Sequence, residues 1–318
     1  MRAMFGAGLP TPSKSPTVGL LFRRSLMLFK TLATQSCRKW HPSGQQSTRK
    51  MNMFVQRSVC FVIACLAVSS LSVAADSPLK KEWTVDGVPR EALVFAASQP
   101  TDGGSPVVFA FHGHGGTMRH AAATFAYQKH WPEAVVVYMQ GLNTPGKLTD
   151  PEGKKSGWQS GPGDQKDRDL LFFDAVLASM KKDHPIDENR IYSTGHSNGG
   201  GFTYLLWAKR GDTFAAFAPV AASAGVYFIT AKPKPKPLFH AASEKDPLVT
   251  FAMQQRTLTR VKKLNGCDEP GEDWAKGCLR YSSKQGTPVV IYLHGEGHKY
   301  PAATPALIVK FFKEHAKE

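Results

Sequence analysis

The first 75 residues contain no aspartate or glutamate, although they hold ten of the chain's 40 lysines and arginines. The remainder therefore has 30 basic against 25 acidic residues, so the formal charge of +15 overstates how basic the folded part is. A balance this close to neutral, without a concentrated basic patch, gives little support to nucleic-acid binding. We expect no nucleic-acid partner.

The chain also lacks an apolar run long enough for a stable membrane span. The stretch 58–73 has 16 residues, whereas a spanning helix needs about 20. A short basic segment, 51–57, precedes it, and Val73 and Ala75 occupy the small-residue positions of a cleavage site. This layout predicts a secretory signal peptide over residues 51–75, and therefore a secreted or periplasmic protein.

Residues 1–50 lie upstream of that signal and show no hydrophobic period. We expect a basic extension that is not part of the mature protein, with a transit peptide or a nucleic-acid-binding tail as alternatives. A loose lipoprotein-like site at Cys65 leaves a lipid anchor as a minor alternative. Residues 76–318 are enough for one catalytic domain with a large core, and they contain no internal repeat.

Cysteine is scarce, with five in the chain, three of which precede residue 76. Cys267 and Cys278 remain, and they flank a loop rich in glycine, proline and acidic residues. An even number of cysteines in an exported protein predicts a disulfide between them, worth about 3 kcal/mol in the entropic account. A metal pair is the weaker alternative because no other soft ligand lies nearby.

Continuous apolar runs alternate with stretches of helical length. The expected strands are 106–111, 134–138, 190–194, 214–220, 237–240 and 288–293, and the expected helices are 118–131, 167–182, 202–209 and 305–317. Continuous apolar runs are typical of strands covered on both faces. The alternation predicts the α/β class, with a mostly parallel central sheet and helices on both faces.

The pentapeptide Gly195-His196-Ser197-Asn198-Gly199 lies between an expected strand and an expected helix. A G-x-S-x-G sequence in that setting predicts a nucleophile elbow, a strained turn that exposes the serine hydroxyl. The alternative is a flexible glycine loop. We expect Ser197 to be a nucleophile.

A serine hydroxyl needs a neighbouring base to accept its proton, and in elbow enzymes the acid and then the histidine follow the serine. Asp246, before a proline and two apolar residues, is the favoured acid, and Glu244 is the alternative. His298, in a glycine-rich loop after the last expected strand, is the favoured base. His294, joined directly to that strand, is the alternative.

Two N–H groups should stabilise the oxyanion of the tetrahedral intermediate. One is the backbone N–H of Asn198, directly after the nucleophile. The other is the backbone N–H of His114, in the glycine-rich segment after an early strand. His112 and His114 could instead form half of a zinc site, but no third ligand follows at suitable spacing. We expect no metal and no cofactor.

The segment 141–166 is rich in Gly, Pro, Lys and Asp and has no apolar period. Long connections inside compact domains are often functional. This one follows a strand, at the edge of the sheet where α/β folds bind ligands. Trp158 and Gln159 are its expected substrate contacts, and packing of the loop by Trp158 is an equal alternative.

Taken in order, these motifs resemble the secreted polyhydroxybutyrate depolymerase and feruloyl esterase group of α/β hydrolases. The resemblance covers about residues 106–312 and rests on segments 112–116, 140–142, 157–159, 187–200, 246–249, 265–267 and 297–298. It implies an α/β-hydrolase fold with Ser197, Asp246 and His298 as the triad. Two extra residues between His240 and Asp246 depart from the pattern and keep Glu244 open as the acid.

The sequence therefore predicts a secreted serine esterase that works through an acyl-enzyme without a cofactor. The chain ends soon after His298, with no polymer-binding domain of the kind carried by depolymerases of solid polyester, which favours soluble esters. Expected substrates are feruloyl or acyl esters of plant polysaccharide, or short polyhydroxyalkanoate-type polyesters. The alternatives are an exported serine peptidase of the same fold and a catalytically inactive binding module.

Overall fold

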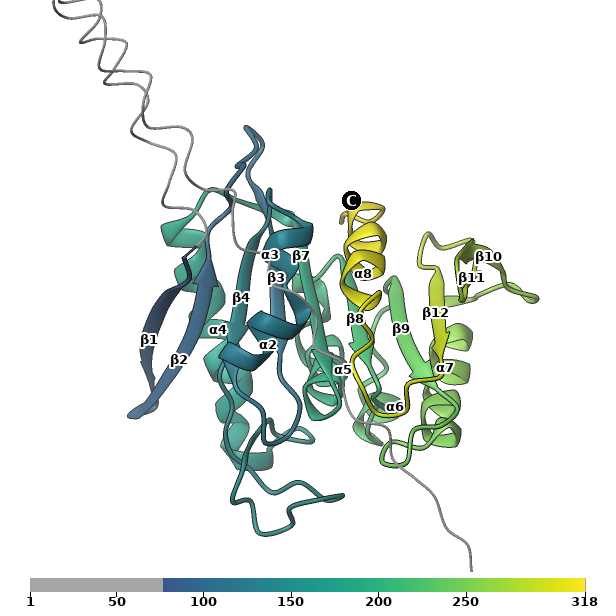
Figure 1. Ribbon diagram of the computed structural model, residues 1–318, viewed down its shortest axis with the longest axis horizontal. Helices are drawn as coiled ribbons and strands as arrows, with labels where there is room; N and C mark the ends of the chain where they lie inside the picture. The colour runs from purple at the N-terminus through teal and green to yellow at the C-terminus, as the bar shows by residue number, and fades with distance from the viewer. Residues whose placement is uncertain (1–76, 318) are drawn as a thin grey trace, which may run out of the picture. The chain divides into compact units, whose positions relative to one another are not determined.

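A computed structural model describes residues 77–317, so the predicted extension 1–50 and signal peptide 51–75 lie outside the described residues. A ten-stranded sheet, in the order β1-β2-β4-β3-β7-β8-β9-β12-β11-β10, forms the centre of this part (Figure 1). Its strands are β1 Leu79–Val85, β2 Val88–Phe95, β3 Ser105–Phe111, β4 Val135–Met139, β7 Ile186–His196, β8 Ala216–Val220, β9 Leu238–Ser243, β10 Glu272–Ala275, β11 Cys278–Tyr281 and β12 Val289–His294.

The six strands from β4 to β12 are mutually parallel, and the outer pairs are antiparallel. In register, Phe109 of β3 faces Val137 of β4 on one side and Ser193 of β7 on the other. The six parallel strands coincide with the six apolar runs of the sequence, because each is covered by helices on both faces. The predicted mostly parallel α/β sheet is confirmed.

Two hydrophobic cores lie on opposite faces of the sheet. One face is covered by α2 Met118–Phe125, α3 Tyr127–His130 and α8 Thr304–Lys313, and the other by α4 Arg168–Asp183, α5 Asn198–Arg210, α6 Tyr227–Ala231 and α7 Phe251–Asn265 (Figure 1). Within residues 77–317, no helix combines the length and the apolar character needed to cross a membrane.

Local chemistry explains where some elements differ from expectation. The helix expected over 118–131 is broken at Ala126, which has a left-handed φ of 46°. The N–H of Tyr127, freed at that break, donates instead to the hydroxyl of Tyr138 at 2.8 Å. The β1–β2 hairpin was not expected because exposed polar residues interrupt β1. Trp83 nevertheless anchors it on Phe172 of α4.

The predicted disulfide is not formed, because Cys267 and Cys278 are both free. Cys267 packs against the core beneath α7, whereas Cys278, the first residue of β11, belongs to the core on the other face of the sheet. Their sulfur atoms lie near different carbonyls, those of Thr287 and Lys276 respectively. The sheet therefore separates two thiols that are close in sequence.

The segment 141–166 contains a two-strand hairpin, β5 Leu142–Asn143 with β6 Ser156–Gly157, and leads into a 3-10 turn, η1 Asp164–Asp167. It follows the carboxyl end of β4, as its place in the sequence suggested. Because β3, β7, β9 and β12 are parallel, the loops after them open at the same edge of the sheet.

Candidate active site

Ser197 lies in a sharp turn between β7 and α5. Its backbone has φ 56° and ψ −118°, a strained conformation for a residue with a side chain. Close approach explains the flanking glycines: a Cβ on Gly199 would lie 2.3 Å from the carbonyl oxygen of Phe111, and one on Gly195 would lie 2.5 Å from Gly199. This is the geometry of a nucleophile elbow.

Ser197, His298 and Asp246 lie together, each in the loop that follows a parallel strand. Nε2 of His298 is 2.8 Å from Oγ of Ser197, and Nδ1 is 2.8 Å and 3.0 Å from the carboxylate oxygens of Asp246. An ionised carboxylate only accepts hydrogen bonds, so Nδ1 carries the proton and Nε2 is free to accept one. The arrangement can therefore draw the proton from the serine hydroxyl.

The two alternatives that the sequence left open lie elsewhere. Glu244 is exposed, and its side chain makes no hydrogen bond to His298. His294, at the end of β12, accepts a hydrogen bond from the backbone N–H of Glu296 in its own loop. The structure brings Asp246 and His298, rather than these two residues, to Ser197.

A buried hydrogen-bond chain lies behind Asp246. Gln254 of α7 donates to Oδ2 of Asp246 at 3.2 Å and accepts from Nε2 of His240 at 3.0 Å. Nδ1 of His240 then accepts from the hydroxyl of Tyr204 at 2.9 Å. Gln254, His240 and Tyr204 are fully buried, so the chain holds one orientation of the carboxylate. No sequence motif predicted a role for these three residues.

The two predicted oxyanion donors are the backbone N–H groups of His114 and Asn198, and Asn198 directly follows Ser197. Gly113 packs against the serine, since a Cβ there would lie 3.5 Å from Cβ of Ser197. Neither N–H donates to an acceptor within residues 77–317. Asn198 is also the first residue of α5, where the helix dipole favours negative charge. Both N–H groups thus have no acceptor within the described residues, and their role as oxyanion donors stays a prediction.

Two histidines beside the serine, the buried His112 and the half-buried His196, are neutral at physiological pH. Burial lowers the pKa of His112 and that of His196 to about 4. His112 accepts a hydrogen bond from the N–H of Gly141 at 3.0 Å, and His196 donates to the carbonyl of His298 at 3.1 Å. These hydrogen bonds connect the loops around Ser197, and the two neutral imidazoles add no charge to the site.

His112 and His114 point to different partners. Nε2 of His114 bonds to Asp150 at 3.0 Å, and the same carboxylate accepts the N–H groups of Lys154 and Lys155. This contact ties the loop 141–166 to the segment that carries the His114 N–H. Nδ1 of His114 is buried without a partner in the described part of the chain.

The structure corrects the expected role of Trp158. Its side chain is fully buried between Phe111 and Phe202, and its indole N–H donates to the carbonyl of His112 at 2.9 Å. Its backbone exchanges two hydrogen bonds with the side-chain amide of Asn198, at 2.7 and 3.0 Å. Trp158 therefore packs the loop against the serine turn and does not line the cavity.

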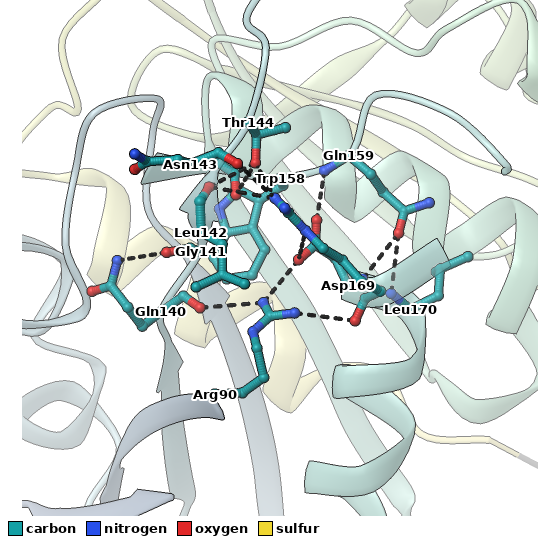
Figure 2. Close-up of polar contacts among 12 residues, drawn as sticks. Arg90, Gln140, Gly141, Leu142, Asn143, Thr144, Trp158, Gln159, Asp169 and Leu170 are labelled. Carbon is teal, nitrogen blue, oxygen red and sulfur yellow. Dashed lines mark hydrogen bonds and ion pairs between the residues drawn. The ribbon is translucent and has the colours of Figure 1, made fainter. Parts of the chain in front are cut away.

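Gln159 borders the cavity, but both ends of its amide are hydrogen-bonded, and Figure 2 shows the contacts of the oxygen with Asp169 and Leu170. Its oxygen accepts the N–H groups of Asp169 and Leu170, at the start of α4. Its nitrogen donates to the carbonyl of Gly161 and to the carboxylate of Asp167. The side chain caps a helix and braces the loop, so it leaves no free group for a substrate.

A buried ion pair lies under the same loop. Figure 2 shows Arg90 of β2 pointing toward Asp169 and the carbonyl of Gln140. The guanidinium is 2.8 Å from Asp169, and both side chains are at most 1% exposed. Asp169 also accepts the N–H of Gln159 at 2.8 Å. The pair joins residues 79 positions apart, so no local pattern could have predicted it.

A cavity of about 670 Å³ opens above Ser197. Part of its lining is apolar, with the partly or largely exposed side chains of Leu148, Val226 and Leu248 beside Tyr227 and Met253. Apolar walls around a few polar groups are typical of small-molecule sites. The cavity has room for an acyl or aryl group next to the serine.

No family model matches the chain, but individual proteins do. The chain is 28% identical over 155 residues to feruloyl esterase D of Neurospora crassa, covering 46% of this chain and 52% of that one. It is 27% identical over 279 residues to poly(3-hydroxyalkanoate) depolymerase C of Paucimonas lemoignei, covering 74% and 64%. The chain thus spans less than two thirds of either relative. The expected resemblance to this group is confirmed.

Among solved structures, an acetyl xylan esterase from Aspergillus awamori superposes with a TM-score of 0.55 at 12% identity. The match covers 74% of this chain and 99% of the esterase. The fold is that of the α/β hydrolases. In this fold the serine turn, the His298 loop and the Asp246 loop occupy the carboxyl edge of the sheet, where α/β folds bind ligands.

Proposed function

We propose that this α/β hydrolase is a carboxylic ester hydrolase in which Ser197, His298 and Asp246 form a catalytic triad. The observation that carries the proposal is the unbroken contact from Ser197 Oγ through the imidazole to the carboxylate, at 2.8 Å in each step. A hydroxyl linked in this way becomes nucleophilic as its proton moves to the base.

In the first half-reaction, Ser197 attacks the ester carbonyl and His298 takes the serine proton. His298 then protonates the leaving alcohol, while Asp246 orients and stabilises the imidazolium. In the second half, His298 activates a water molecule that hydrolyses the acyl-enzyme. The N–H groups of His114 and Asn198 act as the oxyanion hole, each worth about 3 kcal/mol in the transition state.

The substrates we propose are feruloyl or acyl esters of plant polysaccharide, or short polyhydroxyalkanoate-type polyesters. Support comes from the printed names of the relatives, a feruloyl esterase and a poly(3-hydroxyalkanoate) depolymerase. The apolar wall formed by Leu148, Val226 and Leu248 suits an aromatic or aliphatic acid.

We also propose that residues 76–318 are the mature catalytic domain and that residues 51–75 direct its export. The support is the pattern of a basic start, an apolar core and small residues before Asp76. Sequencing the N-terminus of the protein recovered from outside the producing cytoplasm tests this, and a mature start near residue 76 is expected.

Hydrolysis of 4-nitrophenyl acetate, 4-nitrophenyl butyrate and methyl ferulate, measured beside Ser197→Ala, tests the activity. The wild type should turn over at least one ester, and the ranking of the three should separate aliphatic from phenolic acids. Matched amide substrates test the peptidase alternative, which predicts faster amide cleavage. A folded protein that hydrolyses no ester and is not labelled by a fluorophosphonate would instead support an inactive binding module.

A further inference from the structure

The cavity above Ser197 has a basic lining. Its charged side chains apart from histidine are Lys147, Arg256 and Arg260, and no aspartate or glutamate of residues 77–317 lines it. The carboxylate of Asp246 lies behind His298 and is 5% exposed. A cavity walled by low-dielectric protein focuses the field of such cations on whatever enters it.

These three cations are free of carboxylate partners. None of the ion pairs within residues 77–317 includes Lys147, Arg256 or Arg260. Arg190 and Arg210, by contrast, each pair with an aspartate, at 2.6 and 2.7 Å. The guanidinium of Arg256 donates only to a backbone carbonyl of its own helix. The charged side chains of Lys147, Arg256 and Arg260 therefore have hydrogen-bond donors that can bind another molecule.

Helix α7 presents both arginines on the face that borders the cavity. Met253, Arg256, Thr257 and Arg260 follow the spacing of one helical face, and all four line the cavity. The same two arginines also line a second hollow of about 710 Å³, together with Tyr281. A substrate that extends from one hollow into the other therefore contacts both guanidinium groups.

We propose that the substrate carries a carboxylate near the scissile ester, and that Arg256 and Arg260 bind this carboxylate. The proposal rests on the esterase function proposed above and narrows its substrate class. A guanidinium matches a carboxylate with two parallel hydrogen bonds, which an ammonium cannot do. The carboxylate can belong to a uronic acid unit of the esterified polysaccharide, or to the free acid end of a hydroxyacid oligomer.

Two matched substrate pairs distinguish these sources. One pair is acetylated oligogalacturonide against acetylated xylo-oligosaccharide, and the other is the linear 3-hydroxybutyrate trimer against its methyl ester. We compare kcat/KM for the charged and the neutral member in the wild type and in the Arg256→Gln, Arg260→Gln double variant. Arg119→Gln, at an exposed position on α2 outside both hollows, is the matched control.

For the substrate pair that resembles the natural substrate, the ratio of kcat/KM for the charged member to that for the neutral member should fall by about tenfold in the double variant. The change should come mainly from a higher KM for the charged member. Arg119→Gln should leave the ratio unchanged. Raising the ionic strength from about 0.02 to about 0.5 M should lower the ratio in the wild type but not in the double variant, because salt screens exposed charges.

A ratio that neither the double variant nor salt changes, in either pair, would overturn the carboxylate proposal. So would turnover of 4-nitrophenyl butyrate without turnover of either charged substrate. The proposed esterase function fails separately, by the absence of Ser197-dependent hydrolysis of every ester. Thermal unfolding of the double variant checks that it is folded, and both positions are exposed, so little change is expected.

Discussion

Gln254 donates a hydrogen bond to Oδ2 of Asp246 while its own carbonyl oxygen accepts one from His240. The opposite oxygen of Asp246 accepts the backbone N–H groups of Leu248 and Val249, at 2.9 and 3.0 Å. Both carboxylate oxygens are therefore held from the protein side while they face His298. The orientation of Asp246, the proposed triad acid, therefore depends on a helix residue that hydrogen-bonds to neither Ser197 nor His298.

Replacing Gln254 by leucine removes this support. We expect kcat for a neutral ester to fall by about 10- to 100-fold with KM nearly unchanged, because misorientation of Asp246 affects the transition state more than substrate binding. Steady-state kinetics measure the split. Gln99→Leu, at an exposed position outside both hollows, is the control. A raised KM with unchanged kcat would show that Gln254 acts on binding instead.

The buried pair of Arg90 and Asp169 predicts an asymmetric stability effect. Arg90→Met should cost about 3–5 kcal/mol in the free energy of unfolding, because it removes the close partner of a buried carboxylate and leaves only Arg168, whose Nε is 3.6 Å from it. Lys234→Gln, which breaks the exposed pair with Asp212, should cost under about 1 kcal/mol. Urea denaturation measures both. Equal, small effects would mean that Asp169 is not a buried charge.

The close approach of Gly199 to Phe111 predicts that the elbow does not tolerate a methyl group. Gly199→Ala should destabilise the protein by about 1–3 kcal/mol and lower activity, since the clash is with backbone of β3 that cannot rotate away. Gly103→Ala is the control, because a Cβ there meets nothing within 4 Å. Thermal unfolding compares the two, and an equal effect of both would contradict the described packing.

Three desolvated histidines, two of them buried and His196 half-buried, predict a loss of stability in mild acid. Burial lowers the pKa of His112, His196 and His240 from 6.5 to about 4. Between these values the unfolded chain binds protons that the folded chain does not, so their contribution is complete above about pH 6.5 and is lost as the pH falls toward 4. The free energy of unfolding should drop by an amount on the order of several kcal/mol.

Urea denaturation at pH 7 and at pH 4.5 measures this loss. His240→Gln should reduce the difference between the two pH values, and His130→Gln, at an exposed position, serves as the control. A free energy of unfolding that stays constant or rises on acidification would contradict the neutral state of these histidines.

The central sheet could be predicted because its parallel strands are buried on both faces. A strand such as β4 must then be apolar at every position, and this is visible locally. The β1–β2 hairpin and α7 were not predicted because each is buried on one face only. Their exposed faces are polar, and α7 alternates buried Leu258 and Val261 with charged residues. Their apolar positions are too few to stand out in a single sequence.

The residues expected at the serine site followed from local order, since the elbow motif and the loops after strands are sequence features. What surrounds them depends on contacts between distant segments. Trp158 is buried because its ring packs against Phe111 and Phe202, and Arg90 is buried because it forms an ion pair with Asp169. Cys267 and Cys278 are neighbours in sequence but lie on opposite faces of the sheet. These relationships exist only after the chain has folded.

The most direct test of the account is the rate of ester hydrolysis by Ser197→Ala, compared with the wild type at equal folded concentration. The hydroxyl is the only group removed, and His298, Asp246 and both N–H donors stay in place. We expect kcat/KM to fall by at least about 10³-fold, together with loss of fluorophosphonate labelling. Hydrolysis by the variant at the wild-type rate would contradict Ser197 as the nucleophile and the proposed mechanism with it.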